Sequence, residues 1–237
     1  MRCFSFHRVY NYERGGVIMI NIGQIVLDNF SRSFEIREND IGSDAHLHAK
    51  GIRLNTESWE VEGIGHLCIM RMNFLFNLVS METVVLSSVH KDVPLFNVDT
   101  MRFGSTETFM AELYDTPLEP WPPEANKAFE AIQDQNRDLP EYEHSGHWYD
   151  PILFPCSMAK KGKGYSARFT KAADDYIDAF VKQLKNAPEC SADEKTAKTA
   201  EFAGRLIAEG GPAADTMVKL FGKEIAERMI RKHMYGI

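Results

Sequence analysis

The sequence has few cysteines, no long apolar run and no excess of basic residues. Its cysteines number four and are widely separated: Cys3, Cys68, Cys156 and Cys190. None of them forms a CxxC pair, which excludes a zinc knuckle and a thioredoxin-type motif. Lys and Arg number 27 against 34 Asp and Glu, and this net charge of −7 argues against a general nucleic-acid-binding protein. The apolar runs fall far short of the roughly 20 residues that cross a bilayer. We therefore predict a cytoplasmic protein with free thiols and with neither a nucleic-acid nor a membrane partner.

Several motifs of nucleotide-binding proteins and hydrolases are also missing. The chain holds no GxGxxG, GxxxxGK[ST], HExxH or GxSxG. His144 and His147 have a spacing compatible with one metal ion, but no third ligand stands nearby, so we predict no metal site. Residues 1–18 show no clear period, and Met19 is a second possible start. We expect residues 1–18 to be a disordered or extension segment and residues 19–237 to form a single domain.

The hydrophobic pattern changes along the chain from a period of two to a helical period. Alternation predicts strands over residues 67–78, 81–89, 95–103 and 106–113, and the short turns between them favour antiparallel pairing. A further pair of strands is expected at 152–154 and 165–169. Helical spacing predicts helices over 24–36, 124–136, 172–184, 194–208 and 213–234. Strands that precede helices indicate an α+β protein, with an antiparallel sheet covered by helices.

The most informative stretch is residues 91–101, because it places a carboxylate inside an apolar strand. Alternation puts Asn97, Asp99, Met101 and Phe103 on one face of that strand. A carboxyl on a half-buried sheet face loses hydration, so its pKa rises and it can donate a proton near neutrality. The alternative, which the pattern alone favours, is an aspartate that caps a turn or pairs with Arg102.

Glu82 is a second candidate for acid–base chemistry. It lies in the preceding predicted strand, between Met81 and Thr83. If the two strands are neighbours, Glu82 and Asp99 face one site, where two close carboxyls raise one pKa. The alternative is an edge-strand glutamate that points into water.

Three blocks of the sequence resemble a known family. Residues 92–99, Asp-Val-Pro-Leu-Phe-Asn-Val-Asp, look like the D-[LV]-P-x-F-x-x-D signature of the ferredoxin-dependent bilin reductases. Residues 216–224, with Met234 and Tyr235, are similar to the closing helix of that family. Between these blocks, residues 168–171 followed by 174–180 resemble its strand-to-helix step.

The resemblance implies a single-domain α/β/α sandwich with three layers and a central antiparallel sheet. A linear tetrapyrrole such as biliverdin would bind between the sheet and the C-terminal helices. No cofactor or metal would be bound: reduced ferredoxin would deliver electrons one at a time, and the protein would supply protons. By the same resemblance Asp99 matches the central proton donor, Glu82 matches a position close to the pyrrole nitrogens, and Arg168 would hold a propionate.

Two positions depart from the family pattern. Gly211 stands where many members have an acidic or amide residue just before the last helix, and Asp215 would need a shifted backbone to replace it. Glu82 stands where the family has His or Asn. These departures leave two alternatives to a biliverdin-type reductase: a protein that binds a linear tetrapyrrole without reducing it, or a reductase of a different open-chain tetrapyrrole.

Apolar and basic residues complete the expected site. A bilin needs a wide apolar slot with cations at its rim, and the strands offer a flexible wall: Met70, Met72, Phe74, Met81, Met101 and Phe103. Such a stripe is also typical of plain core. A local basic patch follows Cys156 and contains no acidic residue: Lys160, Lys161, Lys163, Arg168 and Lys171. This patch is suited to docking an acidic ferredoxin, or it is a solvated loop.

Overall fold

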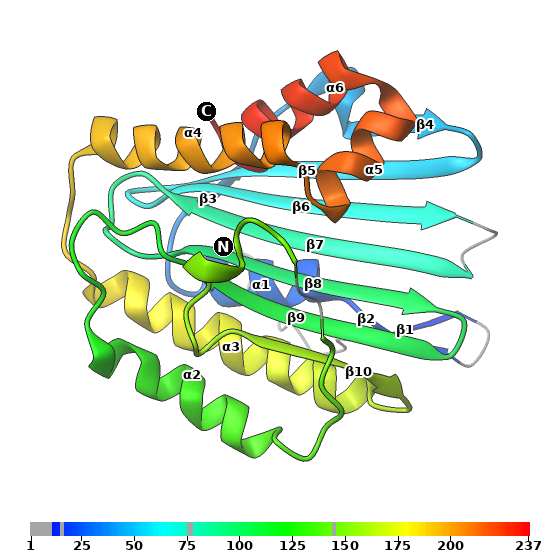
Figure 1. Cartoon of the computed structure of the whole chain (residues 1–237), viewed down its shortest axis with the longest axis horizontal. Coiled ribbons are helices and arrows are strands. Elements are labelled where there is room, and N and C mark those ends of the chain that lie inside the picture. Colours follow the sequence, from blue (N-terminus) through cyan, green and yellow to red (C-terminus); the bar gives the residue numbers. More distant parts are fainter. Residues whose placement is uncertain (1–10, 15–16, 75–77, 144–145) are drawn as a thin grey trace, which may run out of the picture.

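A large antiparallel sheet dominates the computed structural model, which describes residues 11–14, 17–74, 78–143 and 146–237 (Figure 1). The strand order is β10-β9-β8-β7-β6-β5-β3, and β4 also pairs with β5. The strands are β3 (Ile36–Glu38), β4 (His46–Ala49), β5 (Ile52–Val61), β6 (Gly65–Phe74), β7 (Val79–Ser88), β8 (Leu95–Phe103), β9 (Thr106–Tyr114) and β10 (Met158–Lys163). The predicted α+β class, with an antiparallel sheet, is confirmed.

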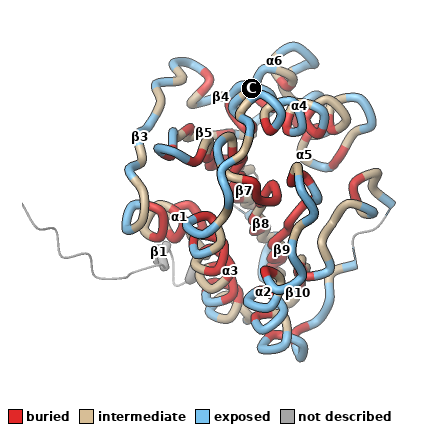
Figure 2. Tube along the Cα trace, turned by 90° about the vertical axis from the view of Figure 1, so that its left-hand side faces the viewer, coloured by how far each residue is buried: buried red, intermediate tan, exposed pale blue. Residues whose placement is uncertain are grey.

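Two groups of helices cover the sheet, one on each face (Figure 2). One group is α1 (Ile22–Ser31), α2 (Pro123–Gln135) and α3 (Ser166–Asn186). The other group is C-terminal: α4 (Ala192–Glu209), α5 (Pro212–Phe221), α6 (Lys223–Arg228) and the π-helix η3 (Met229–Met234). Two short 3-10 helices lie in connections, η1 (Gly42–Ala45) and η2 (Asp150–Ile152). Figure 2 shows α1 and α3 on one side of β7, β8 and β9, and α4 and α5 on the other.

Two hydrophobic clusters follow from strand alternation. Val84, Val98 and Phe109 point to the first helix group and pack with α1, α2 and α3. Val85, Met70 and Tyr114 point to the opposite face and pack with the C-terminal helices. Because successive side chains of a strand alternate between the faces, each central strand contributes to both clusters. The two faces of the sheet are therefore separate chemical environments.

The structure corrects several predicted elements. The strand expected at 165–169 is wrong, since Ser166 begins α3 and the strand that pairs with β9 is β10. Leu153 forms only an isolated bridge with Tyr114. The single helix expected over 213–234 is interrupted at Gly222, whose φ of +85° is easily adopted only by glycine. Strand β5 was not predicted.

Only part of the N-terminal segment lies within the described residues. Residues 1–10 and 15–16 lie outside the described residues, and so does His144. Strand β1 (Asn11–Arg14) pairs with β2 (Val17–Ile20) as a separate antiparallel hairpin. The expectation of a disordered segment over 1–18, and of one domain over 19–237, stays a prediction.

Candidate functional site

Asp99 lies in the middle of β8, on the sheet face that the C-terminal helices cover. Its register partners are Thr83 on β7 and Met110 on β9. Thr83 in turn pairs with Met70 on β6, whose side chain belongs to the C-terminal cluster. The predicted face of β8 is therefore correct. The two simple alternatives fail, because Asp99 is not at a turn and Arg102 points to the opposite face.

The Asp99 carboxyl is held by two hydrogen bonds. The Thr83 hydroxyl donates to Oδ1, and Asn97 Nδ2 donates to Oδ2 at 2.5 Å. The residue retains part of its surface, but protein atoms surround the carboxyl group itself. Burial, followed by the negative charge of Glu112, raises the pKa of Asp99 to about 7, although both hydrogen bonds lower it. Asp99 can therefore carry a proton near neutral pH.

A second buried carboxyl, which sequence reasoning missed, lies beside Asp99. Glu112 on β9 is the register partner of Asn97, and Asn97 Nδ2 donates to Glu112 Oε2 at 3.3 Å. The Tyr114 hydroxyl donates to the same oxygen at 2.7 Å. The available signal was the same as for Asp99: an acidic residue inside an apolar, alternating strand. Only the register, however, shows that Glu112 and Asp99 share a face.

A small cavity lies next to Thr83, the hydrogen-bond donor of Asp99, between the sheet and the C-terminal helices. Its volume is about 30 Å³. The sheet contributes Thr83, which also donates to Asp99, and a wall of apolar side chains: Leu54, Met70, Met72 and Met81. The helical side contributes Ala213, Thr216, Met217 and Met234. Met81 thus lines the cavity, as expected for a site of flexible methionines.

The other two predicted apolar contacts lie towards the end of the sheet. Met101 follows Asp99 on the same face and pairs with Met81. Phe103, at the end of β8, has 63% of its surface exposed. The structure therefore brings Asp99, Met81 and Met101 together and leaves Phe103 at the margin.

The C-terminal segment that forms the outer wall is anchored at its end. Ser87 Oγ donates to the Tyr235 carbonyl at 2.7 Å, and a ring nitrogen of His66 contacts the His233 carbonyl at 2.7 Å. Asp44 accepts two hydrogen bonds from Arg228 and lies 2.8 Å from His233 Nε2. In contrast, α5 buries only two side chains, Ala214 and Met217. These polar contacts fix the wall near η3, whereas Ala213, Leu220 and Phe221 of α5 are only partly buried against the same cluster.

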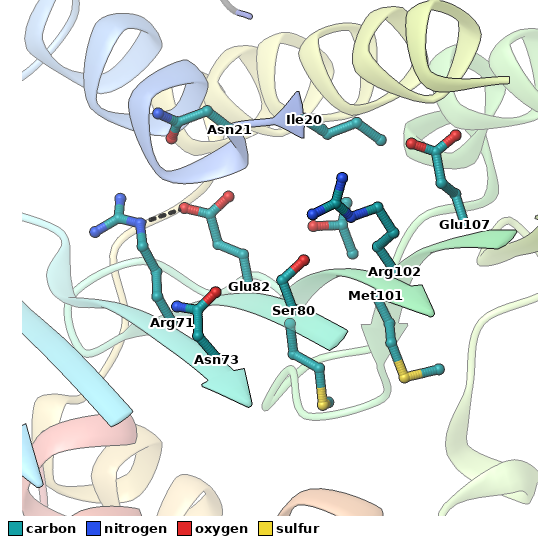
Figure 3. A pocket seen from close by; sticks show the side chains of 11 residues that line it. Ile20, Asn21, Arg71, Asn73, Ser80, Glu82, Met101, Arg102 and Glu107 are labelled. Atoms are coloured by element: carbon teal, nitrogen blue, oxygen red, sulfur yellow. Dashed lines mark hydrogen bonds and ion pairs between the residues drawn. The ribbon is translucent and has the colours of Figure 1, made fainter. Parts of the chain in front are cut away.

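Glu82 lies on the opposite face of the sheet from Asp99. Strands β7 and β8 are neighbours, but Glu82 pairs with Thr100, one residue from Asp99. The prediction that the two carboxyls face one site is therefore wrong, because a shift of one residue reverses the face. Figure 3 shows Glu82 beside Arg71, on the side of Asn21 and Arg102.

The surroundings of Glu82 explain its burial. Arg71 Nε donates to Oε1 at 2.7 Å, and the backbone N–H of Ile22, at the start of α1, donates to Oε2 at 2.8 Å. Burial raises the pKa of Glu82, although Arg71 opposes the rise. A cavity of about 210 Å³ lies on this face, between Glu82, Arg102 and Glu107. In this arrangement Glu82 stabilises the N-terminus of α1.

Asp92, the first residue of the signature, holds neighbouring backbone and a buried lysine in place. Asp92 accepts hydrogen bonds from the backbone N–H groups of Leu118 and Glu119, at 2.7 and 2.9 Å. It also lies 3.5 Å from Nζ of Lys195, a fully buried lysine on α4. Lys195 donates to the Val93 carbonyl at 2.6 Å. This part of the motif connects α4 to the start of β8, whereas Asp99 lies further along β8, on the sheet face that the C-terminal helices cover.

Arg168 is distant from the cavity. It lies in the first turn of α3, on the other face of the sheet, and forms an ion pair with Asp138 at 2.6 Å. The expected strand-to-helix step does not occur there, because residues 165–169 are not a strand. Its predicted role in holding a propionate finds no support in this position.

The predicted basic patch is largely neutralised by acidic neighbours. Lys160 is buried and pairs with Glu141, and Lys171 pairs with Asp175 at 2.5 Å. Lys161 and Lys163 remain exposed on β10, and Lys161 lies over the Tyr142 ring. Lys160 was expected on a docking surface, but alternation along β10 turns it inward.

Gly211 is buried at the N-cap of α5. A Cβ atom there would lie 2.8 Å from Leu206 Cδ1 and 3.6 Å from Tyr149 Cε1. Asp215 is exposed, and its carboxyl lies beside Gly210, so it does not take the place of a side chain at Gly211. The end of α4 and the start of α5 therefore carry no acidic group towards the cavity.

Metal-ligand clusters and membrane-spanning helices are absent from the described part of the chain. No group of three or more His, Cys, Asp or Glu residues there is arranged to hold a metal ion. None of its helices is both long and apolar enough to cross a membrane. Cys68, Cys156 and Cys190 are free thiols.

Comparisons with known proteins agree with the fold. No family model matches the chain. The 15,16-dihydrobiliverdin:ferredoxin oxidoreductase of Prochlorococcus marinus (strain NATL1A) is 22% identical over 196 residues, which cover 78% of this chain and 82% of the relative. The protein of the same name from Parasynechococcus marenigrum (strain WH8102) is 23% identical over 186 residues, covering 75% and 79%.

A solved structure shares the architecture. The crystal structure of phytochromobilin synthase from tomato, in complex with biliverdin, matches with a TM-score of 0.72 at 14% identity. The match covers 91% of this chain and 82% of the tomato chain. At this identity the structural likeness establishes the fold, and the sequence matches establish distant homology. The chain is thus a distant homologue of ferredoxin-dependent bilin reductases and shares their fold.

Proposed function

We propose that this protein reduces a linear tetrapyrrole of the biliverdin type with electrons from ferredoxin, and that Asp99 donates protons to the substrate. The proposal takes the helices on both sheet faces to be the α/β/α sandwich of the family. Its main support is the position of Asp99, a carboxyl with a pKa near 7 beside an apolar, methionine-lined cavity. Neither feature alone would indicate this chemistry.

The reaction needs a proton source of this kind. Reduction of one carbon–carbon double bond takes up two electrons and two protons, and a ferredoxin delivers one electron at a time. Each electron makes the conjugated substrate more basic, so a nearby neutral carboxyl can transfer its proton. Because its pKa lies near 7, Asp99 is both protonated often enough to donate and acidic enough to release the proton.

Binding requires that the cavity widens. Pockets for ligands of this size have volumes of roughly 300–1,000 Å³, whereas the cavity beside Asp99 has about 30 Å³. Helix α5 is the element that can move, because it buries only Ala214 and Met217 and is bounded by Gly210 and Gly222, both with positive φ. We infer that the tetrapyrrole displaces α5 and lies along the methionine wall.

Ferredoxin is expected to dock at exposed lysines on β10. Lys161 and Lys163 are exposed on β10 and carry the positive charge that remains of the predicted basic patch. We expect Lys161→Glu with Lys163→Glu to lower kcat/KM for ferredoxin by on the order of tenfold at low salt, because complementary charge speeds association. Lys127→Glu with Lys198→Glu, at exposed positions on α2 and α4, is the matched control. Equal effects of both changes would contradict docking at β10.

The experiment is anaerobic mixing of the protein with biliverdin and a ferredoxin-reducing system, followed by absorbance. We expect a complex whose long-wavelength absorption moves to shorter wavelength when reduced ferredoxin is supplied, because reduction shortens the conjugated system. The spectrum should remain unchanged without ferredoxin. Absence of a complex with biliverdin would contradict the proposal.

The alternative is a protein that binds a linear tetrapyrrole without reducing it. The observation that favours it is the absence of an acidic side chain at Gly211, next to Tyr149 and the start of α5. Tight biliverdin binding with no spectral change under reduced ferredoxin would support this alternative. The third possibility, a different open-chain tetrapyrrole, depended on Glu82, and the position of Glu82 on the other face removes that argument. A panel of linear tetrapyrroles in the same assay tests it.

A further inference from the structure

Asp99 and Glu112 form a pair of carboxyls linked by one amide. Asn97 Nδ2 donates to Asp99 Oδ2 at 2.5 Å and to Glu112 Oε2 at 3.3 Å. Since both oxygens contact the same nitrogen, they lie less than about 6 Å apart, a separation at which like charges influence each other strongly. Glu112 itself is buried, with 6% of its surface exposed.

The groups that surround Asp99 and Glu112 are hydroxyls, phenols and a thiol, which carry no charge in their protonated forms. Tyr114 on β9 donates to Glu112, and Thr83 on β7 donates to Asp99. Tyr149 of the loop before η2 and Tyr235 after η3 lie close enough to both carboxyls that their charges raise the pKa of each phenol, after burial as the main cause. Cys68 on β6 also lies close to Tyr235, and burial raises the pKa of its thiol.

We propose that Glu112 is a positioning residue that acts through Asp99: its negative charge keeps one proton on the pair and returns Asp99 to the protonated form after each donation. This inference deepens the proposed function and rests on it for its use in catalysis. In each step the Asp99 O–H bond breaks and the proton passes to the substrate that has accepted one electron. Two neighbouring carboxylates then remain, and their repulsion favours uptake of a proton from water. A second electron and a second proton complete the reduction.

The described contacts support this division of roles. Thr83, which donates to Asp99, lines the cavity, whereas Tyr114 and Asn97, which donate to Glu112, do not. Glu112 accepts from Tyr114 and Asn97, and hydrogen bonds of this kind stabilise a charged carboxylate. Burial first, and the charge of Glu112 second, raise the pKa of Asp99 to about 7. The proton of the pair therefore belongs on Asp99, the member whose hydrogen-bond donor Thr83 lines the cavity.

The test is the titration of Asp99 in the ligand-free protein and in Glu112→Gln. Infrared difference spectra against pH report the carbonyl stretch of a protonated carboxyl, and the band missing in Asp99→Asn belongs to Asp99. We expect Glu112→Gln to lower the titration midpoint of Asp99 by about one to two pH units. Glu107→Gln is the matched control, since Glu107 is equally buried on β9 but lies on the opposite face. It should leave the midpoint unchanged.

A second readout is the pH profile of bilin reduction. In the parent, the rate should fall as the pH rises through about 7; in Glu112→Gln this fall should occur one to two pH units lower, with about tenfold less activity at neutral pH. Glu112→Asp keeps the charge and should restore most of the profile. Should Glu112→Gln not fold, Glu112→Met removes the charge with a side chain of similar length.

The outcomes separate this inference from the proposed function. An unchanged Asp99 midpoint in the variant that lacks the Glu112 charge overturns the inference, even if bilin reduction occurs. A loss of rate that is equal at every pH, with no shift of the profile, would show a merely structural role and also overturn it. A shifted midpoint in a protein that does not reduce biliverdin supports the coupling of the two carboxyls and contradicts only the proposed function.

Discussion

Replacement of Asp99 by asparagine should change how the stability of the protein depends on pH. The folded state raises the pKa of Asp99 from 3.8 to about 7, so between these values it holds a proton that the unfolded chain has released. Stability therefore falls as the pH rises through this interval, and the full cost is present above pH 7. At 1.36 kcal/mol for each pH unit, the rise corresponds to ~4 kcal/mol. Asparagine does not ionise and does not carry this cost.

The assay is urea unfolding followed by tryptophan fluorescence at about pH 4.5 and about pH 8. Relative to the parent, Asp99→Asn should gain about 3 kcal/mol more stability at the higher pH than at the lower one, because roughly 1 kcal/mol of the cost is already present at pH 4.5. Comparison of two pH values cancels the constant cost of the altered hydrogen bonds to Thr83 and Asn97. Glu130→Gln, an exposed change on α2, should shift stability by less than about 0.5 kcal/mol at both. If Asp99→Asn has the same effect at both pH values, the carboxyl titrates normally and the reasoning is refuted.

Three other substitutions test the contacts around the site. Arg71→Met leaves the buried Glu82 carboxylate without its cation and should destabilise the protein by about 3 kcal/mol in urea unfolding near pH 8; a neutral result would contradict the assigned pairing. Lys195→Met should cost about 3 kcal/mol in the same assay, because Asp92 keeps a buried charge, and no loss would show that α4 is held elsewhere. Met217→Ala removes a buried side chain of α5 and should lower the free energy of unfolding by about 2–3 kcal/mol in thermal unfolding. The same change should speed association of biliverdin, because α5 then packs less tightly against the sheet. Slower association would argue against displacement of α5.

Local patterns were sufficient to predict the strand that carries the site. Residues 95–103 alternate regularly and follow Pro94, and β8 has the predicted bounds. The same alternation placed Asp99 and Met101 on one face, which the register confirms. These features depend on residues that are close in the sequence, so the sequence contains the information directly.

Features that depend on distant residues could not be predicted. Whether Glu82 or Thr83 faces Asp99 depends on the register of β7 against β8, and an offset of one residue reverses the answer. Lys160 seemed to be a surface charge because the chain around it is basic, yet its position on β10 turns it inward to Glu141. Glu112 is distant from Asn97 in the sequence, and only the register of β9 against β8 brings the two residues together.

The central claim is that Asp99 transfers a proton to a bound tetrapyrrole. It is tested most directly by single-turnover mixing of the biliverdin complex with reduced ferredoxin, in the parent and in Asp99→Asn, followed by absorbance and electron paramagnetic resonance. The account predicts that Asp99→Asn binds biliverdin and accepts an electron but stalls as a radical, without forming the reduced product. Reduction by Asp99→Asn at the rate of the parent would contradict the account.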